Sequence, residues 1–76
     1  RPDLPEAHNN LGNALRDLGR PDDARAAYQK ALELNPALGA TYTNLAKTCQ
    51  EQGRYDEARR WYDEALRCDP AAAHLY

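Results

Sequence analysis

The sequence contains no Val, Ile, Phe, Met or Ser. Val, Ile and Phe are the usual residues of β-strands, and only three Thr supply any β-branched side chains. Almost all aliphatic residues are Ala and Leu, which are strong helix formers. These absences predict an all-α chain, and the lack of Ser excludes a serine hydrolase.

The chain also lacks a basic stretch and a long apolar run. Its net charge is −2 and its pI is about 5.6, whereas a nucleic-acid-binding protein usually carries a basic patch that contacts phosphates. No stretch approaches the roughly 20 apolar residues of a membrane span. We therefore expect one small domain that binds neither nucleic acid nor membrane.

The chain repeats itself with an offset of 34 residues. Internal repeats indicate a repeat architecture, in which each unit buries its apolar face against its neighbour. Identical pairs include Asn10/Asn44, Leu11/Leu45, Gly19/Gly53, Arg20/Arg54, Asp22/Asp56, Ala24/Ala58, Arg25/Arg59, Tyr28/Tyr62, Ala31/Ala65, Leu32/Leu66 and Pro36/Pro70.

Each repeat is predicted to form two antiparallel helices joined by short connections. In the second helix, apolar residues recur at positions i, i+3, i+4, i+7 and i+8, beginning at Ala24 and again at Ala58. Gly19 and Gly53 are expected to end the first helices in a left-handed conformation. The pattern predicts helices over 5–18, 22–34, 39–52 and 56–68.

The two units resemble tetratricopeptide repeats. Such repeats are marked by a large residue, Leu–Gly, Ala, an aromatic residue, Ala and Pro at fixed offsets. The matching residues are His8, Leu11, Gly12, Ala24, Tyr28, Ala31 and Pro36, then Tyr42, Leu45, Ala46, Ala58, Tyr62, Ala65 and Pro70. The resemblance implies a right-handed α-solenoid within residues 1–76: one repeat over 5–38, a second over 39–72, and the start of a truncated third over 73–76.

The resemblance also implies a function, which is the binding of an extended peptide in the concave groove lined by the first helices. We expect the groove side chains to be Asn9, Asn10, Asn13, Thr43, Asn44 and Lys47. Asn10 and Asn44 stand one repeat apart, and a carboxamide offers both a donor and an acceptor to a peptide backbone. Similar asparagine ladders occur in O-linked N-acetylglucosamine transferase, although both residues could instead bond a neighbouring helix.

Three functions remain open from the sequence: a peptide-binding scaffold, the substrate-recruiting arm of a larger enzyme such as a glycosyltransferase of that kind, and a structural or oligomerising array. Binding of a chaperone C-terminal tail is disfavoured. Asn13 and Asn44 match the two asparagines of that carboxylate clamp, but Asn9 and His74 stand where lysines are expected.

No catalytic site is predicted in the chain. Cys49 and Cys68 align with leucines, which favours packing, and a Cys49–His8 pair has no third group to orient it. The two Cys form no CxxC motif, and the four Gly are isolated, which excludes a glycine-rich phosphate loop. We expect no metal, no cofactor and no enzymatic activity. Two Cys far apart in the sequence are compatible with a reducing compartment, and we expect the cytoplasm.

The chain is expected to associate with itself. Its last residues align with the start of the second repeat, which suggests a fragment of a longer array. The outer face of the last helix, at Trp61, Tyr62 and Leu66, is then left without a following repeat. An exposed end of this kind would stack on another chain, continuing the superhelix or exchanging a helix.

Overall fold

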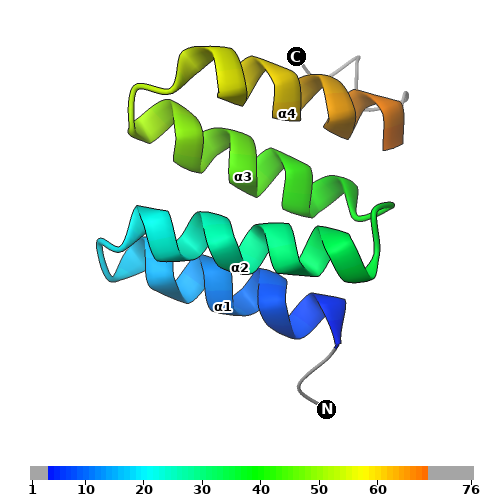
Figure 1. The fold of residues 1–76 in the computed structure, drawn as a ribbon, viewed down its shortest axis with the longest axis horizontal. Helices are drawn as coiled ribbons and strands as arrows, with labels where there is room; N and C mark the ends of the chain where they lie inside the picture. The colour runs from blue at the N-terminus through cyan, green and yellow to red at the C-terminus, as the bar shows by residue number, and fades with distance from the viewer. Residues whose placement is uncertain (1–3, 69–76) are drawn as a thin grey trace.

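The computed structural model describes residues 4–68, and within this range it contains four α-helices and no strand (Figure 1). They are α1 (Pro5–Asp17), α2 (Pro21–Leu34), α3 (Gly39–Glu51) and α4 (Tyr55–Cys68). Each boundary lies within one residue of the predicted helix. The all-α fold and the order of helices are therefore confirmed, whereas the expected third unit at 73–76 lies outside the described residues.

Local sequence signals explain where the helices begin and end. Pro21 opens α2 and is followed by Asp22 and Asp23 in its first turn, where carboxylates interact favourably with the helix dipole. Asp22 is thus a first-turn acid, and Arg20 is the N-cap residue. Gly19 and Gly53 follow α1 and α3 with φ of 76° and 78°, as predicted. This left-handed conformation lets the next backbone N–H groups bond back to the last helical turn.

The helices follow one another as antiparallel neighbours, α1 against α2 and α3 against α4, and α3 also packs across α2 (Figure 1). The core lies where α2, α3 and α4 meet and is built from small residues between larger ones. Its buried members are Ala24, Tyr28, Leu32, Tyr42, Leu45, Cys49, Ala58 and Ala65. The alternation of Ala with Tyr or Leu lets the helices approach closely.

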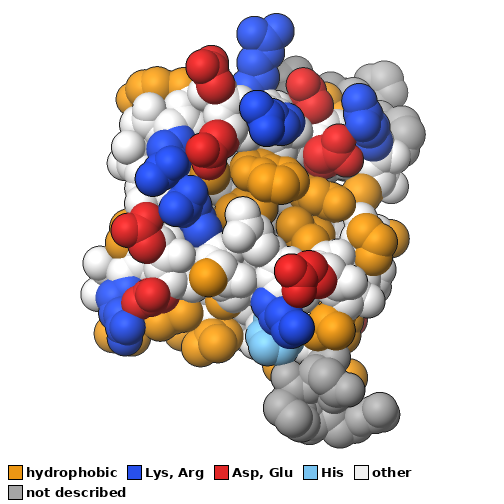
Figure 2. Space-filling model, in the orientation of Figure 1, with side chains coloured by type: hydrophobic (Ala, Val, Ile, Leu, Met, Phe, Trp, Pro, Cys, Tyr) orange, Lys and Arg blue, Asp and Glu red, His pale blue; other side chains and the backbone are white. Residues whose placement is uncertain are grey.

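The surface carries both signs of charge close together. Figure 2 shows Lys and Arg side chains interspersed with Asp and Glu around a central group of hydrophobic side chains. No helix in the described range combines the length and the apolar character needed to cross a bilayer.

Candidate functional site

The residues expected in the groove lie on α1 and α3, and these two helices are joined by hydrogen bonds at Asn9. The Oδ1 atom of Asn9 accepts two hydrogen bonds from α3. One comes from Oγ1 of Thr41 at 2.9 Å, and the other comes from Nδ2 of Asn44 at 3.2 Å. A single carboxamide oxygen therefore joins the two helix pairs on this face.

Thr41 explains why an acceptor is needed at Asn9. The Thr41 side chain is buried, and a buried hydroxyl without a partner is costly. These contacts use only the Oδ1 atom of Asn9 and the Nδ2 group of Asn44. The Nδ2 group of Asn9 and the Oδ1 atom of Asn44 have no hydrogen-bond partner among residues 4–68. The face thus presents one donor and one acceptor from adjacent helix pairs.

Asn10 and Asn44 are equivalent in the sequence but have different surroundings. Asn44 is half-buried and bonds the preceding helix pair, whereas Asn10 is exposed on α1 and makes no side-chain hydrogen bond to a described residue. Asn13 lies farther along α1, where its Oδ1 accepts a 2.5 Å hydrogen bond from the hydroxyl of Tyr28. The three asparagines of α1 therefore differ in how much of each carboxamide remains available.

The other two expected groove residues are on α3. The hydroxyl of Thr43 donates to the backbone carbonyl of Gly39 at 3.3 Å, which leaves its oxygen able to accept. Lys47 is exposed and lines a hollow together with Tyr62, Ala65 and Leu66 of α4. Its ammonium forms no ion pair with a described residue.

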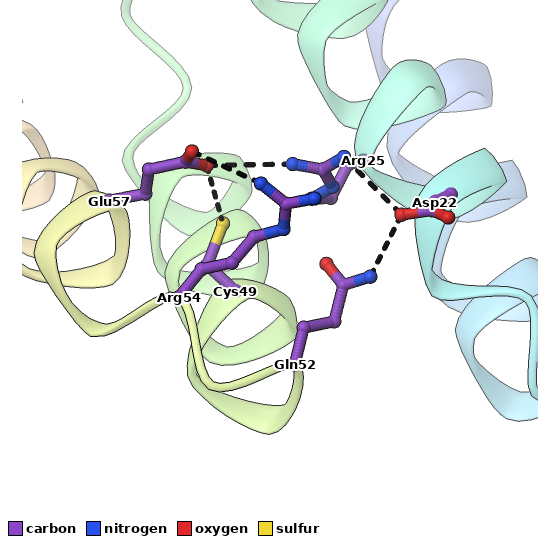
Figure 3. Close-up of polar contacts among 6 residues, drawn as sticks. All are labelled: Asp22, Arg25, Cys49, Gln52, Arg54 and Glu57. Carbon is purple, nitrogen blue, oxygen red and sulfur yellow. Dashed lines mark hydrogen bonds and ion pairs between the residues drawn. The ribbon is translucent and has the colours of Figure 1, made fainter.

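A second polar cluster, for which the sequence offers no motif, joins the two helix pairs through their helix ends (Figure 3). Arg25 of α2 contacts Asp22 in its own helix at 3.3 Å and Glu57 of α4 at 3.5 Å. Gln52 donates to Asp22 at 2.8 Å, and the Cys49 thiol donates to Glu57 at 3.8 Å. The cluster therefore links α2 with the end of α3 and the start of α4.

This cluster changes the acidity of two of its members. The hydrogen bond from Gln52 lowers the pKa of the exposed Asp22 carboxyl, and the nearby positive charge of Arg25 acts in the same direction. Burial raises the pKa of the Cys49 thiol, and the negative charge of Glu57 adds to that effect. A thiol held in its neutral form is a packing group and a poor nucleophile.

The residues expected at the outer face of α4 do not all point to the same side. Trp61 stacks on Tyr42 of α3 with ring centroids 5.9 Å apart. It also lines hollows with α2 residues such as Gln29 and Leu32. Tyr62 and Leu66 instead line the apolar hollow beside Lys47. Trp61 therefore belongs to the junction between the helix pairs. Of the three residues expected at the outer face, Tyr62 and Leu66 lie at this hollow and Trp61 does not line it.

Within the described residues, no group of three or more His, Cys, Asp or Glu side chains is placed to hold a metal ion. The polar groups described above on α1 and α3 are carboxamides, the hydroxyls of Thr41 and Thr43, and the ammonium of Lys47. Such groups are suited to hydrogen bonding with a backbone or a side chain.

Comparison with protein families places the fold in a known class. Residues 3–71 match the model of the Tetratricopeptide repeat. The chain belongs to this family. Tetratricopeptide repeats are generally protein–protein interaction modules that bind protein partners, and the family points to a non-catalytic role for this chain.

A solved structure shows the same arrangement. The structure titled "Crystal structure of MamA" aligns with this tetratricopeptide repeat chain with a TM-score of 0.85 and 26% sequence identity. The alignment covers 92% of this chain and 41% of the MamA chain, so this chain spans less than half the length of that relative. A search of curated proteins gave no match.

Proposed function

We propose that the α1/α3 face, defined by Asn9, Asn10, Asn13, Thr43, Asn44 and Lys47, binds an extended peptide segment of a partner protein. The observation that carries this proposal is the Asn9–Asn44 contact. It aligns a free amide donor and a free carbonyl acceptor from neighbouring helix pairs. An extended backbone presents a carbonyl and an N–H group that can bond this pair, whatever its side chains are.

Further groups on the same side favour a ligand rich in hydrogen-bond acceptors. Nδ2 of Asn13 remains available because the Tyr28 hydroxyl occupies only its Oδ1. Lys47 adds an exposed ammonium. Backbone carbonyls and carboxylates of a peptide would satisfy these donors.

The test begins with a library of random linear peptides displayed on phage and selected against the 76-residue chain. Enriched peptides are then synthesised and titrated by calorimetry against the wild-type chain and against Asn10→Ala/Asn44→Ala. This variant removes the free acceptor of Asn44 and the exposed carboxamide of Asn10 on the same face. Two lost hydrogen bonds of about 1 kcal/mol each would weaken binding by roughly tenfold or more.

A control variant, Gln29→Ala/Lys30→Ala, removes two exposed side chains from α2. It should bind the peptides as tightly as the wild-type chain, because α2 contributes none of the residues of the α1/α3 face. Circular dichroism must show that both variants remain folded, since Asn44 also contacts Asn9. Equal affinity for the wild type and the Asn10/Asn44 variant would refute binding through these asparagines.

A further inference from the structure

The interface between α2 and α3 shows how one helix pair receives the next in this chain. Tyr28 and Leu32 of α2 pack against Leu45 and Cys49 of α3, and all four side chains are buried. The same junction carries polar contacts at its edges, with Arg25 reaching Glu57. It therefore provides a structural template for how two helix pairs stack.

The 34-residue period places a counterpart of each half of this interface on an outer side of the molecule. Leu66 of α4 corresponds to Leu32, and it lines the apolar hollow described above. Leu11 of α1 corresponds to Leu45, but it is 49% exposed where Leu45 is fully buried. Leu18, at the end of the same helix, is 72% exposed.

The two residues that form the ion pair of the internal junction also have counterparts, one on each outer face. Arg59 of α4 corresponds to Arg25, and Asp23 of α2 corresponds to Glu57. Arg59 is exposed and has no ion-pair partner among the described residues. Asp23 pairs with Arg20 of its own helix turn, as Glu57 pairs with Arg54. Among the described residues, however, Asp23 has no counterpart of the ion pair that Glu57 forms with Arg25 of the neighbouring helix pair.

We propose that a second copy of this chain docks head to tail, with its α1 packed on the α4 face of the first copy. Leu11 of the second copy then lies against Leu66 of the first, as Leu45 lies against α2. Arg59 of the first copy forms an ion pair with Asp23 of the second. The oxygen of Thr43 accepts a hydrogen bond from Asn10, which repeats the contact between Asn9 and Asn44.

Two features favour a second copy over an unrelated partner. The two faces belong to the same chain and are complementary in both apolar surface and charge. The α1 face is also more apolar than the corresponding face of α3. Ala7 stands at the position of Thr41, and Leu18 stands at the position of Gln52, which follows α3. Such an interface uses different surfaces on each copy, so it adds copies without closing unless the rotation forms a ring.

Sedimentation velocity of the full 76-residue chain over a range of concentrations tests this association. We expect the average mass to rise with concentration beyond that of a dimer. Leu11→Glu places a charge in the junction and should weaken association at least about tenfold, whereas its exposed position leaves the monomer folded. Arg59→Glu should weaken association by up to about fivefold, and adding Asp23→Arg should restore it.

A mixing experiment distinguishes head-to-tail docking from a symmetric dimer. Leu11→Glu blocks the α1 face, and Leu66→Glu blocks the α4 face, so each variant alone should be monomeric. A mixture should form a one-to-one complex that does not grow, because one open face of each kind remains. If Leu66→Glu is not folded by circular dichroism, Arg59→Glu takes its place, with a weaker effect.

Two results would overturn the proposal. The first is a full chain that remains monomeric at every concentration. The second is growth that Leu11→Glu and the charge reversals leave unchanged, which would place self-association on another surface.

Discussion

The aromatic ring of Tyr28 lies directly against the backbone of Gly12. A Cβ atom built at Gly12 would come within 2.5 Å of Cε1 and 2.6 Å of Cδ1 of that ring. The ring cannot easily move away, because the Tyr28 side chain is fully buried and its hydroxyl bonds Asn13. Glycine at this position is therefore what allows α1 and α2 to approach each other closely.

Gly12→Ala should destabilise the fold although alanine favours helix. The gain in helix propensity is about 1 kcal/mol, whereas overpacking a rigid core site costs about 1 to 3 kcal/mol. We expect a net loss of about 1 kcal/mol in the free energy of unfolding, measured by urea denaturation. Gly39→Ala is the control, because its Cβ would lie at an ordinary 3.4 Å from Cys68. Equal stabilisation by both substitutions would contradict the close contact.

Asn9→Ala should cost more than the loss of one surface side chain. It removes the acceptor of the buried Thr41 hydroxyl, and an unsatisfied buried polar group costs about 1 to 3 kcal/mol. Asn10→Ala is the control. It removes an exposed side chain and should change the unfolding free energy by less than about 0.5 kcal/mol.

Combining Asn9→Ala with Thr41→Val separates the two contributions in the same urea experiment. Thr41→Val removes the hydroxyl that Asn9→Ala leaves without a hydrogen-bond partner, so the double variant should recover part of the stability lost by Asn9→Ala alone. Additive losses in the double variant would show that the Thr41 hydroxyl does not depend on Asn9.

The sequence predicted the helices well because the signals that define them are local. Gly19 needs only its own backbone conformation to end α1, and Pro21 needs only its fixed φ to begin α2. The spacing of Ala24 and Tyr28 likewise indicates which side of α2 is buried. None of these predictions requires knowing which helix lies opposite.

The polar contacts were not predictable in the same way, because they join residues about 30 positions apart. Asn10 and Asn44 occupy equivalent positions of the repeat. Within the described residues, however, only Asn44 follows another helix pair, and it bonds Asn9 of that pair. Trp61 shows the same limit. Its counterpart Ala27 has no aromatic ring, so the repeat gave no signal for the stacking of Trp61 on Tyr42.

The ion pair between Arg25 and Glu57 should couple the two helix pairs weakly but measurably. Their side chains are 21% and 42% exposed, so solvent screens the interaction and a double-mutant cycle should give about 0.2 to 1 kcal/mol. The coupling should shrink in 1 M NaCl, where the screening length is about 3 Å.

Lys30 and Glu33 form the control pair for this cycle. They lie within α2 and are 53% and 70% exposed, so their coupling should be smaller than that of Arg25 and Glu57. A larger coupling for Lys30 and Glu33 would show that the contact between α2 and α4 contributes little to the stacking of the helix pairs.

The buried thiol and phenol should make the fold less stable in alkaline solution. Burial raises the pKa of Cys49 above 9.0 and that of Tyr28 above 10.0. In the unfolded chain these groups lose their protons at about their ordinary pKa values, while the folded chain retains them. Their contribution to stability is therefore fully present below about pH 9 and is lost as the pH rises through the folded pKa values.

Urea denaturation of the wild type, Cys49→Ala and Cys68→Ala from about pH 7 to about pH 11, which spans the ordinary pKa values of both groups, measures this loss. Cys49→Ala should be less stable throughout, because it leaves a small cavity, but its stability should fall less steeply just above about pH 9. Cys68 is exposed, so Cys68→Ala should follow the wild-type profile. Parallel profiles for all three proteins would show that the Cys49 thiol ionises equally in the folded and unfolded chains.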